Sequence, residues 1–379
     1  MANLFIPGHT VGIVGGGYQG RMLAMAAKNM GFRVSILDPN KQCAAADIAD
    51  VHVLAATTDE SGLISLAEKS DVLTFACNSI NIEAVKSLKN HIAIPQNIEL
   101  LELAQNRLLA KKYFEESNIN ITPYEVIGES ADLDLAIESI GLPAVLKPVE
   151  QQDGKKQSFF INSLMDIRNS LELLASGPCL LESQVDYKRA IAVSVVGNST
   201  GNYQVMPIVE ISPDPTGRFH RGIVPARIHD EVAAEVNRIA EEMALSFKVQ
   251  GVLTVEMFIT EFGVIYVNSL NHGPHDSGDY SLNLGVLSQY EAHLRGLFFW
   301  PIPAQKLLSS GITLPIQQKQ LVDSISMIPF HENWFYHFDG VMSHKPEEIV
   351  GHLTVVTEDV TESLKEIEQT NIWEDIFPA

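Results

Sequence analysis

Cysteine is scarce in this sequence. Only three cysteines occur, Cys43, Cys77 and Cys179, and they are widely spaced without any Cys-x-x-Cys pair. This spacing argues against a disulfide framework and against a cysteine-ligated zinc site. We therefore expect buried free thiols, because an unpaired cysteine behaves as a small apolar side chain.

Long apolar runs are also missing. No stretch approaches the roughly 18 consecutive apolar residues that a membrane-spanning helix needs. The N-terminal segment MANLFIPGHT has neither the basic start nor the long apolar core of a secretory signal peptide. The sequence therefore predicts a cytoplasmic protein that does not bind a membrane.

Positive charge is in short supply as well. Lys and Arg number 26 and Asp and Glu number 47, which gives a formal net charge of −21 at pH 7. Such a surface repels nucleic acids and anionic membranes. A ligand that carries phosphate must therefore be held in a local pocket, and small molecules are the expected partners.

The first unit that can be recognised is a βαβ pattern. With 379 residues, of which 46% are hydrophobic, the chain is long enough for about two to three globular domains. The pattern consists of a strand at Thr10–Val14, a turn with Gly15, Gly17 and Gly20, a helix at Arg21–Met30, a strand at Phe32–Leu37, and Asp38. Further alternation of strands and helices predicts a parallel sheet over about the first 95 residues.

The glycine turn has two interpretations. A G-x-G-x-x-G turn between a strand and a helix is typical of nucleotide binding at a helix N-terminus, and together with Asp38 it raises a nicotinamide-dependent dehydrogenase as one hypothesis. Alternatively, the glycines serve only to let the helix pack closely on the strand. The motif does not decide between these two.

Charged residues follow two later apolar strands. Lys147 leaves the strand Pro143–Leu146 and enters a polar loop, and Glu182 and Val185 end the next strand. A lysine in this position suits a nucleotide phosphate, which it would hold as a point charge. A solvated lysine is the simpler alternative.

Three further segments have clear patterns. Residues 96–118 predict one helical stretch that ends at Asn118, and Ile191–Val196 predicts a strand. Residues 251–267 predict a hairpin of two buried strands. The polar stretch VNSLNHGPHDSGD is expected to begin where the second of these strands stops.

The order of these parts resembles the 5-(carboxyamino)imidazole ribonucleotide synthetases of purine biosynthesis, which are ATP-grasp enzymes. The resemblance covers nearly the whole chain. It rests on these segments: IVGGGYQGRMLAMAA with SILDP, QNRLLAKKYF, LPAVLKP, DGKKQ, LLESQVDYKR, IVPARI, GVLTVEMFIT, VNSLNHGPHDSG and GHLTV.

The resemblance implies an α/β protein with the ATP-grasp fold. It implies a Rossmann-like N-terminal domain (1–122), a small ATP-grasp subdomain (123–188), a large ATP-grasp subdomain (189–305) and a small C-terminal domain (306–379). The family reaction uses ATP to phosphorylate bicarbonate and passes the carboxyl group to the amine of aminoimidazole ribonucleotide. Such chemistry needs cations and Mg²⁺ at the γ-phosphate and a site that excludes water. A homodimer is expected on the resemblance alone.

The resemblance also assigns residues. It places ATP at Arg107, Lys147, Gln157, Glu182, Val185 and Asn268. It assigns catalytic or substrate contacts to Asp153, Lys155 and His275, with Ser277 beside them, and one magnesium contact to Glu256. The loop that contains Asp153 is one residue short, and Gln152 stands where the family usually has Tyr.

Several family positions carry other residues. Ser269 stands where the family has a second metal-binding Glu, Gly273 where it has Arg, and Ala190 where it has a ribose-binding Glu. At the C-terminus the positions of family Lys and Arg residues are taken by Val341, Lys345, Glu348 and Ile349. In the N-terminal domain the exchanges fall at Tyr18, Gln19, Ala76 and Asn78.

These exchanges leave three hypotheses open. The chain is a working carboxylating ligase that uses nearby groups such as Asp276, Asp279, His272 or Lys345; or it is an ATP-grasp enzyme with a changed, less anionic substrate; or it is a relative without catalysis. A dehydrogenase is less consistent with the sequence, because Lys147, Glu182 and Glu256 follow the ATP-grasp order.

Overall fold

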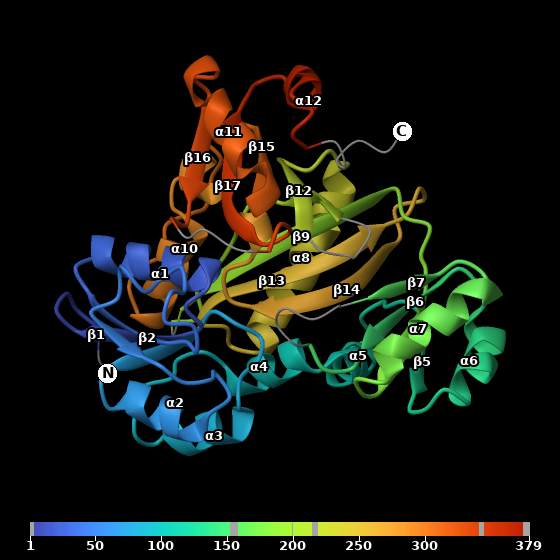
Figure 1. The fold of residues 1–379 in the computed structure, drawn as a ribbon, viewed down its shortest axis with the longest axis horizontal. Helices are drawn as coiled ribbons and strands as arrows, with labels where there is room; N and C mark the ends of the chain where they lie inside the picture. Colours follow the sequence, from blue (N-terminus) through green and yellow to red (C-terminus); the bar gives the residue numbers. More distant parts are fainter. Residues whose placement is uncertain (1–3, 152–157, 199, 214–218, 341–344, 374–379) are drawn as a thin grey trace.

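Within its described residues, the protein folds around three β-sheets, which lie side by side in Figure 1. The computed structural model describes residues 4–151, 158–198, 200–213, 219–340 and 345–373. The first sheet (blue) and the second (green) flank a large central sheet, whose C-terminal strands (orange to red) lie towards the top of the view.

The first sheet is parallel, which confirms the prediction from the glycine-turn unit. Its strand order is β3-β2-β1-β4. The strands are β1 (Thr10–Val14), β2 (Arg33–Leu37), β3 (Val51–Val53) and β4 (Val72–Phe75). The helices that accompany them are α1 (Tyr18–Asn29), α2 (Glu60–Ala67) and α3 (Ile82–Leu88).

The helical stretch expected up to Asn118 is two helices, α4 (Ile98–Gln105) and α5 (Arg107–Glu116). Asn106 divides them, because its backbone is extended and its side chain accepts a hydrogen bond from Leu109 N at 3.0 Å, which caps α5. The backbone N–H of Arg107 then donates to Val149 O at 2.8 Å. The break therefore places Arg107 beside the strand that carries Lys147.

The second sheet is small and antiparallel, with the order β5-β8-β6-β7. Its elements are β5 (Tyr124–Ile127), α6 (Asp132–Ile140), β6 (Ala144–Pro148), β7 (Phe159–Ile161), α7 (Ile167–Leu174) and β8 (Cys179–Ser183). Glu182 pairs with Val145, so Lys147, two residues further along β6, projects from the same face. The sheet register thus brings these two charged side chains together.

The central sheet has nine strands within the described residues, ordered β14-β13-β9-β11-β12-β15-β17-β16, with β10 beside β9. Its strands are β9 (Arg189–Gly197), β10 (Tyr203–Val205), β11 (Val209–Pro213), β12 (Phe219–Val224), β13 (Gly251–Ile259), β14 (Ile265–His272), β15 (Gly311–Gln317), β16 (Trp334–Phe338) and β17 (Ile349–Val356). Its helices are α8 (Asp230–Ser246), α9 (Ser281–Leu284), α10 (Gln289–Leu297), α11 (Leu321–Met327) and α12 (Val360–Gln369).

The predicted hairpin of β13 and β14 is confirmed, but the expected end of its second strand is wrong. The pairing with β13 continues from Val267 to His272, opposite Leu253. Asn268 and Ser269 therefore belong to the strand: Ser269 pairs with Glu256, and Asn268 lies at a β-bulge between this pair and the Val267–Met257 pair. The loop begins only at Gly273.

Helix α10 joins the first sheet to the central sheet. Its residues Tyr290, Leu294 and Leu297 are buried in one cluster with Val11 and Ile13 of β1. Burial of such side chains contributes roughly 1.5–3 kcal/mol each. Because α10 also packs against β13, this helix connects the first sheet to the central sheet.

The expectation for the cysteines holds in part. All three are free; Cys43 and Cys179 are buried, and Cys77 is half-buried. Burial raises the pKa of Cys43 and that of Cys179 to about 11, so both are uncharged thiols at neutral pH.

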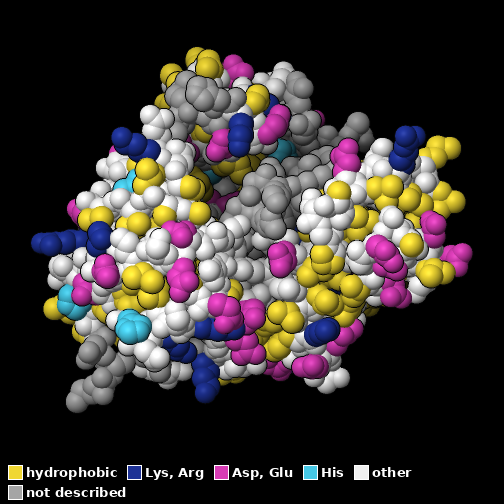
Figure 2. Space-filling view, turned by 60° about the horizontal axis from the view of Figure 1, so that its bottom comes forward, with side chains coloured by type: hydrophobic (Ala, Val, Ile, Leu, Met, Phe, Trp, Pro, Cys, Tyr) yellow, Lys and Arg dark blue, Asp and Glu magenta, His cyan; other side chains and the backbone are white. Residues whose placement is uncertain are grey.

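The described surface is acidic. On the face in Figure 2, Asp and Glu side chains are scattered over the lobes without a broad patch of Lys and Arg among the described residues. None of the helices in the described ranges has the length and apolar character needed to cross a membrane.

Candidate active site

Lys147, Glu182 and Asn268 meet where the second sheet faces the central sheet. The ammonium of Lys147 on β6 lies 3.0 Å from Glu182 Oε2 on β8 and donates to Asn268 Oδ1 on β14, also at 3.0 Å. The sequence assigned all three to the nucleotide, and the structure brings them together from three strands. A lysine held between two strands is well placed to receive a phosphate group.

Arg107 supplies a second cation at this place. Its side chain is packed against β6 and donates from Nη1 to Pro148 O at 2.8 Å. Burial lowers the pKa of Arg107 to about 10, while the charges of Glu182 and Glu256 act in the opposite direction. The guanidinium therefore stays protonated at neutral pH.

Lys111 is a third cation, and sequence reasoning missed it. Its ammonium lies 3.3 Å from Glu182 Oε2 and donates to Thr122 Oγ1 at 2.8 Å. Burial alone would raise the pKa of Glu182, but Lys147 and Lys111 lower it to about 2. Glu182 is thus a buried carboxylate, and three cations surround its single negative charge.

Glu256 marks the other end of this polar region. Its Oε2 accepts a hydrogen bond from Ser269 Oγ at 2.6 Å across the β13–β14 pair, and its Oε1 lies 3.7 Å from His275 Nε2. The backbone N–H of Ser277 donates to His275 Nδ1 at 3.3 Å. The neutral imidazole therefore carries its proton on Nε2, which faces Glu256.

The residues at Glu256 fit a magnesium ion only with the help of a ligand. Ser269 provides a hydroxyl oxygen where a second carboxylate would stand, and within the described residues no group of three or more His, Cys, Asp or Glu is arranged to hold a metal. Mg²⁺ is commonly bound by one or two carboxylates together with substrate phosphates. Glu256 can supply the one carboxylate, and the nucleotide must supply the rest.

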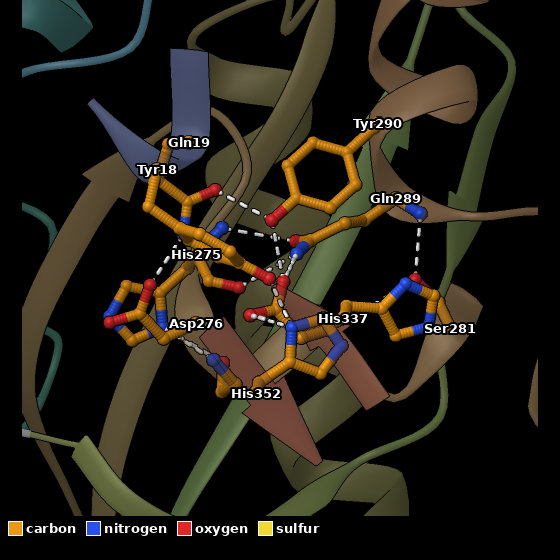
Figure 3. Close-up of polar contacts among 12 residues, drawn as sticks. Tyr18, Gln19, His275, Asp276, Ser281, Gln289, Tyr290, His337 and His352 are labelled. Atoms are coloured by element: carbon orange, nitrogen blue, oxygen red, sulfur yellow. Dashed lines mark hydrogen bonds and ion pairs between the residues drawn. The ribbon is translucent and has the colours of Figure 1, made fainter. Parts of the chain in front are cut away.

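Beyond His275, a buried hydrogen-bond network fills the junction between α1, the loop after β14, α10 and the C-terminal strands (Figure 3). Asp279 lies at its centre: its Oδ1 is 2.5 Å from the hydroxyl of Tyr290 and accepts from Gln289 Nε2 at 2.9 Å. Gln289 also donates to His275 O at 2.8 Å. We call this the junction network.

Two residues of α1 complete the junction network. The hydroxyl of Tyr18 contacts His352 Nδ1 on β17. Gln19 donates to Asp276 and lies 2.8 Å, at its Oε1, from the hydroxyl of Tyr290. Because α1, α10 and β17 are far apart in the sequence, these contacts tie three regions of the chain together.

In the junction network, burial favours the uncharged forms of Asp279, His352 and Tyr18. It raises the pKa of Asp279, with the nearby charge of Asp276 acting in the same direction. It lowers the pKa of His352, which stacks on His337 at 4.7 Å between ring centroids. Burial likewise raises the pKa of Tyr18. The network therefore differs from the cation-rich cluster around Glu182.

Comparison with known proteins agrees with this arrangement. Residues 8–105 match the model of a ribonucleotide synthetase preATP-grasp domain, and residues 112–290 match that of the ATP-grasp domain. An N5-carboxyaminoimidazole ribonucleotide synthase of Bacillus subtilis is 33% identical over 374 residues, which is 98% of this chain and 97% of the relative. The chain belongs to the N5-carboxyaminoimidazole ribonucleotide synthase family.

Other members of this family are similar to nearly the same extent. The enzyme of Staphylococcus aureus strain MRSA252 is 31% identical over 94% of this chain and 95% of its own. A crystal structure of an N5-carboxyaminoimidazole ribonucleotide synthetase with ADP superposes with a TM-score of 0.94 at 30% identity, covering 99% of both chains. The Aspergillus clavatus enzyme with ADP and aminoimidazole ribonucleotide gives 0.89 at 26% identity, covering 97% of this chain and 99% of that one. The predicted ATP-grasp fold is thereby confirmed.

Some of the residues assigned by resemblance to this synthase family have no described position. Asp153, Lys155 and Gln157, with Gln152, and Val341 lie outside the described residues. Val185 follows β8 and is half-buried.

The structure describes the surroundings of two positions at which the residue type departs from the synthase pattern. Gly273 has a φ of +120°, a conformation that side-chain-bearing residues rarely adopt, so an arginine would be strained there. Ala190 is buried in β9, where it pairs with Ile211 and Phe258. The backbone at Gly273 is thus suited to the residue that stands there.

Side chains and backbone of the protein itself make close contacts with the glycine turn. Asp38 accepts hydrogen bonds from the backbone N–H of Gly16 at 2.8 Å and of Asn40 at 2.8 Å, one on each carboxylate oxygen. A Cβ on Gly20, in the first turn of α1, would lie 2.0 Å from Gly15 O. These contacts favour the packing interpretation of the turn over the dinucleotide hypothesis.

Proposed function

We propose that this chain catalyses the ATP-dependent carboxylation of aminoimidazole ribonucleotide with bicarbonate, as a step in purine biosynthesis. The observation that carries the proposal is the convergence of Arg107 and Lys147 on the polar region that also holds Glu182 and Asn268. The full-length similarity to named synthases supports the same reaction.

The side chains divide the work as follows. Lys147 and Arg107 bind the polyphosphate of ATP, and Glu182 with the backbone near Val185 receives the nucleoside. Glu256 would hold Mg²⁺ together with the phosphates, and the ion would neutralise charge as the γ-phosphate is transferred. His275, with Nε2–H aimed at Glu256, contacts the substrate at the reacting end. Asp153, Lys155 and Gln157 remain predictions from the family pattern.

The direct test is ADP release by the purified protein with ATP, Mg²⁺ and bicarbonate, with and without aminoimidazole ribonucleotide. We expect the ribonucleotide to stimulate ADP release. Lys147→Ala should reduce kcat/KM at least about tenfold, because a lost charged contact to phosphate is worth several kcal/mol in a dry site. The surface variant Lys188→Ala is the matched control. ADP release that the ribonucleotide does not change would contradict the proposal.

A changed, less anionic acceptor is a second candidate function. The junction network favours it, because Asp279, Tyr18 and His352 are held in uncharged forms beside the reacting end. The same assay with the dephosphorylated ribonucleoside distinguishes the two. A higher kcat/KM for the ribonucleoside than for the ribonucleotide would support the second candidate.

The family resemblance also leads us to expect a homodimer in the cytoplasm. Sedimentation equilibrium at several protein concentrations measures the oligomeric state. A monomer at every concentration would contradict that expectation.

A further inference from the structure

Two lysines share one carboxylate oxygen at the nucleotide end of the candidate site. Lys147 Nζ lies 3.0 Å and Lys111 Nζ lies 3.3 Å from Glu182 Oε2, and Thr122 Oγ1 donates to the same atom at 3.1 Å. One negative charge cannot neutralise two ammonium groups. The cluster therefore keeps an excess of positive charge even before Arg107 is counted.

The two lysines are held differently. The side chain of Lys111 is 3% exposed, and it is fixed by Thr122 Oγ1 at 2.8 Å. The side chain of Lys147 is 16% exposed, and apart from Glu182 it contacts the amide of Asn268. Lys147 is therefore the lysine that an incoming ligand can reach, whereas Lys111 stays behind it.

This difference between Lys111 and Lys147 matters when a polyphosphate binds. The phosphates attract Lys147 away from Glu182, which would leave a buried carboxylate without a counter-ion if Lys147 were its only partner. Such a carboxylate is costly, and it would take up a proton instead. Lys111 removes this cost, because it keeps Glu182 paired while Lys147 turns to the ligand.

We propose that Lys111 is a positioning residue for ATP: it is the fixed counter-ion of Glu182 that frees Lys147 for the phosphates. This inference rests on the nucleotide-binding part of the proposed function. It predicts that the charge of Lys111 affects binding of ATP much more than binding of adenosine, because only ATP draws Lys147 away from Glu182.

The test compares Lys111→Met with the exposed neighbour Lys112→Met in the full-length protein, by calorimetry with ATP and with adenosine. We expect Lys111→Met to raise the Kd of ATP at least about tenfold and that of adenosine less than about threefold. Lys112→Met should leave both unchanged. Lys111→Arg, which keeps the charge, should restore most of the ATP affinity.

A second measurement follows the protonation of Glu182 through the pH dependence of ATP binding. In Lys111→Met, ATP binding should be accompanied by proton uptake at Glu182, so the variant's ATP affinity should rise more steeply than the wild type's as the pH is lowered from 8 to 6. Adding Glu182→Gln to Lys111→Met should abolish this extra pH dependence. If Lys111→Met does not fold, Lys111→Gln, which keeps a donor for Thr122, takes its place.

The outcomes separate this inference from the proposed function. Equal loss of ATP and adenosine affinity, or a pH profile parallel to that of the wild type, would overturn the positioning role and leave a structural one. ATP binding without any carboxylation would overturn the proposed function but not this inference. A wild-type protein that does not bind ATP would overturn both.

Discussion

Two buried polar regions lie on either side of His275, and they differ in whether their buried groups are charged. Around Glu182, burial is opposed by ion pairing, so charges survive and cations are in excess. In the junction network, burial favours the uncharged forms of Asp279, Tyr18 and His352. The first region is therefore suited to binding a charged ligand, whereas the second connects distant parts of the chain.

The largest effect should come from removing the charge at the centre of the first region. Glu182→Gln leaves Lys111 buried without a counter-ion, so we expect the free energy of unfolding to fall by about 3 kcal/mol. Urea denaturation without nucleotide measures this change. Glu261→Gln, which breaks the exposed pair with Lys188, should cost less than about 0.5 kcal/mol. If Glu182→Gln and Glu261→Gln were equally stable, the buried ion pairs around Glu182 would not differ from an exposed pair, which would contradict the account.

The pH dependence of stability should distinguish the two regions next. Burial raises the pKa of Asp279 in the folded protein, so its contribution is fully present below the unfolded pKa of about 3.9 and is lost as the pH rises. The contribution of Glu182, whose pKa is lowered to about 2, is present above the unfolded value and is lost only as the pH falls towards 2.

Asp279→Asn tests this contrast. It keeps the oxygen that accepts from Tyr290 and Gln289 but cannot ionise. Between pH 4.5 and 8, the fall in stability with rising pH should therefore be smaller in the variant than in the wild type. Unfolding by urea at a series of pH values provides the curves. Parallel curves would show that Asp279 does not ionise differently in the folded and unfolded states.

A smaller effect is expected from a single hydroxyl of the junction network. Tyr290→Phe removes the donor to Asp279 and should lower the free energy of unfolding by about 1–2 kcal/mol. Tyr336→Phe is the matched control, because the buried hydroxyl of Tyr336 has no hydrogen-bond partner within the described ranges. The idea of a network that ties the regions together fails if both variants are equally stable.

The smallest effect concerns the loop between the two regions. Gly273→Ala should cost about 1 kcal/mol, because its φ of +120° is strained for alanine although no atom lies closer than 3.6 Å to the new Cβ. Gly128→Ala serves as control, since its backbone is not in that conformation and its Cβ would make only an ordinary contact. A destabilisation confined to Gly128→Ala would contradict the assigned backbone geometry.

Much of the fold was predictable because the periodic patterns were strong. The glycine-turn unit, the parallel first sheet and the β13–β14 hairpin all followed from them. The errors came where tertiary pairing decides. Asn106 splits a stretch with continuous helical spacing, because it caps α5. β14 continues to His272, because β13 offers partners up to that residue.

Of the candidate site, only charged residues around Glu182 could be predicted from the sequence. Lys147 and Glu182 stand out because each lies at the end of an apolar strand. Lys111 does not, because it lies among other charged residues of α5, and only contacts with Thr122 and Glu182 show that it is buried. The junction network was out of reach, since Tyr18 and His352 are 334 positions apart.

The central claim is that the cation-rich region around Glu182 serves ATP-dependent carboxyl transfer. The most direct measurement supplies ¹³C-labelled bicarbonate with ATP, Mg²⁺ and aminoimidazole ribonucleotide, and follows the label and ADP together by NMR. The account predicts that labelled N5-carboxyaminoimidazole ribonucleotide forms with about one ADP per labelled product. ADP release without transfer of the label, or no ADP release at all, would contradict it.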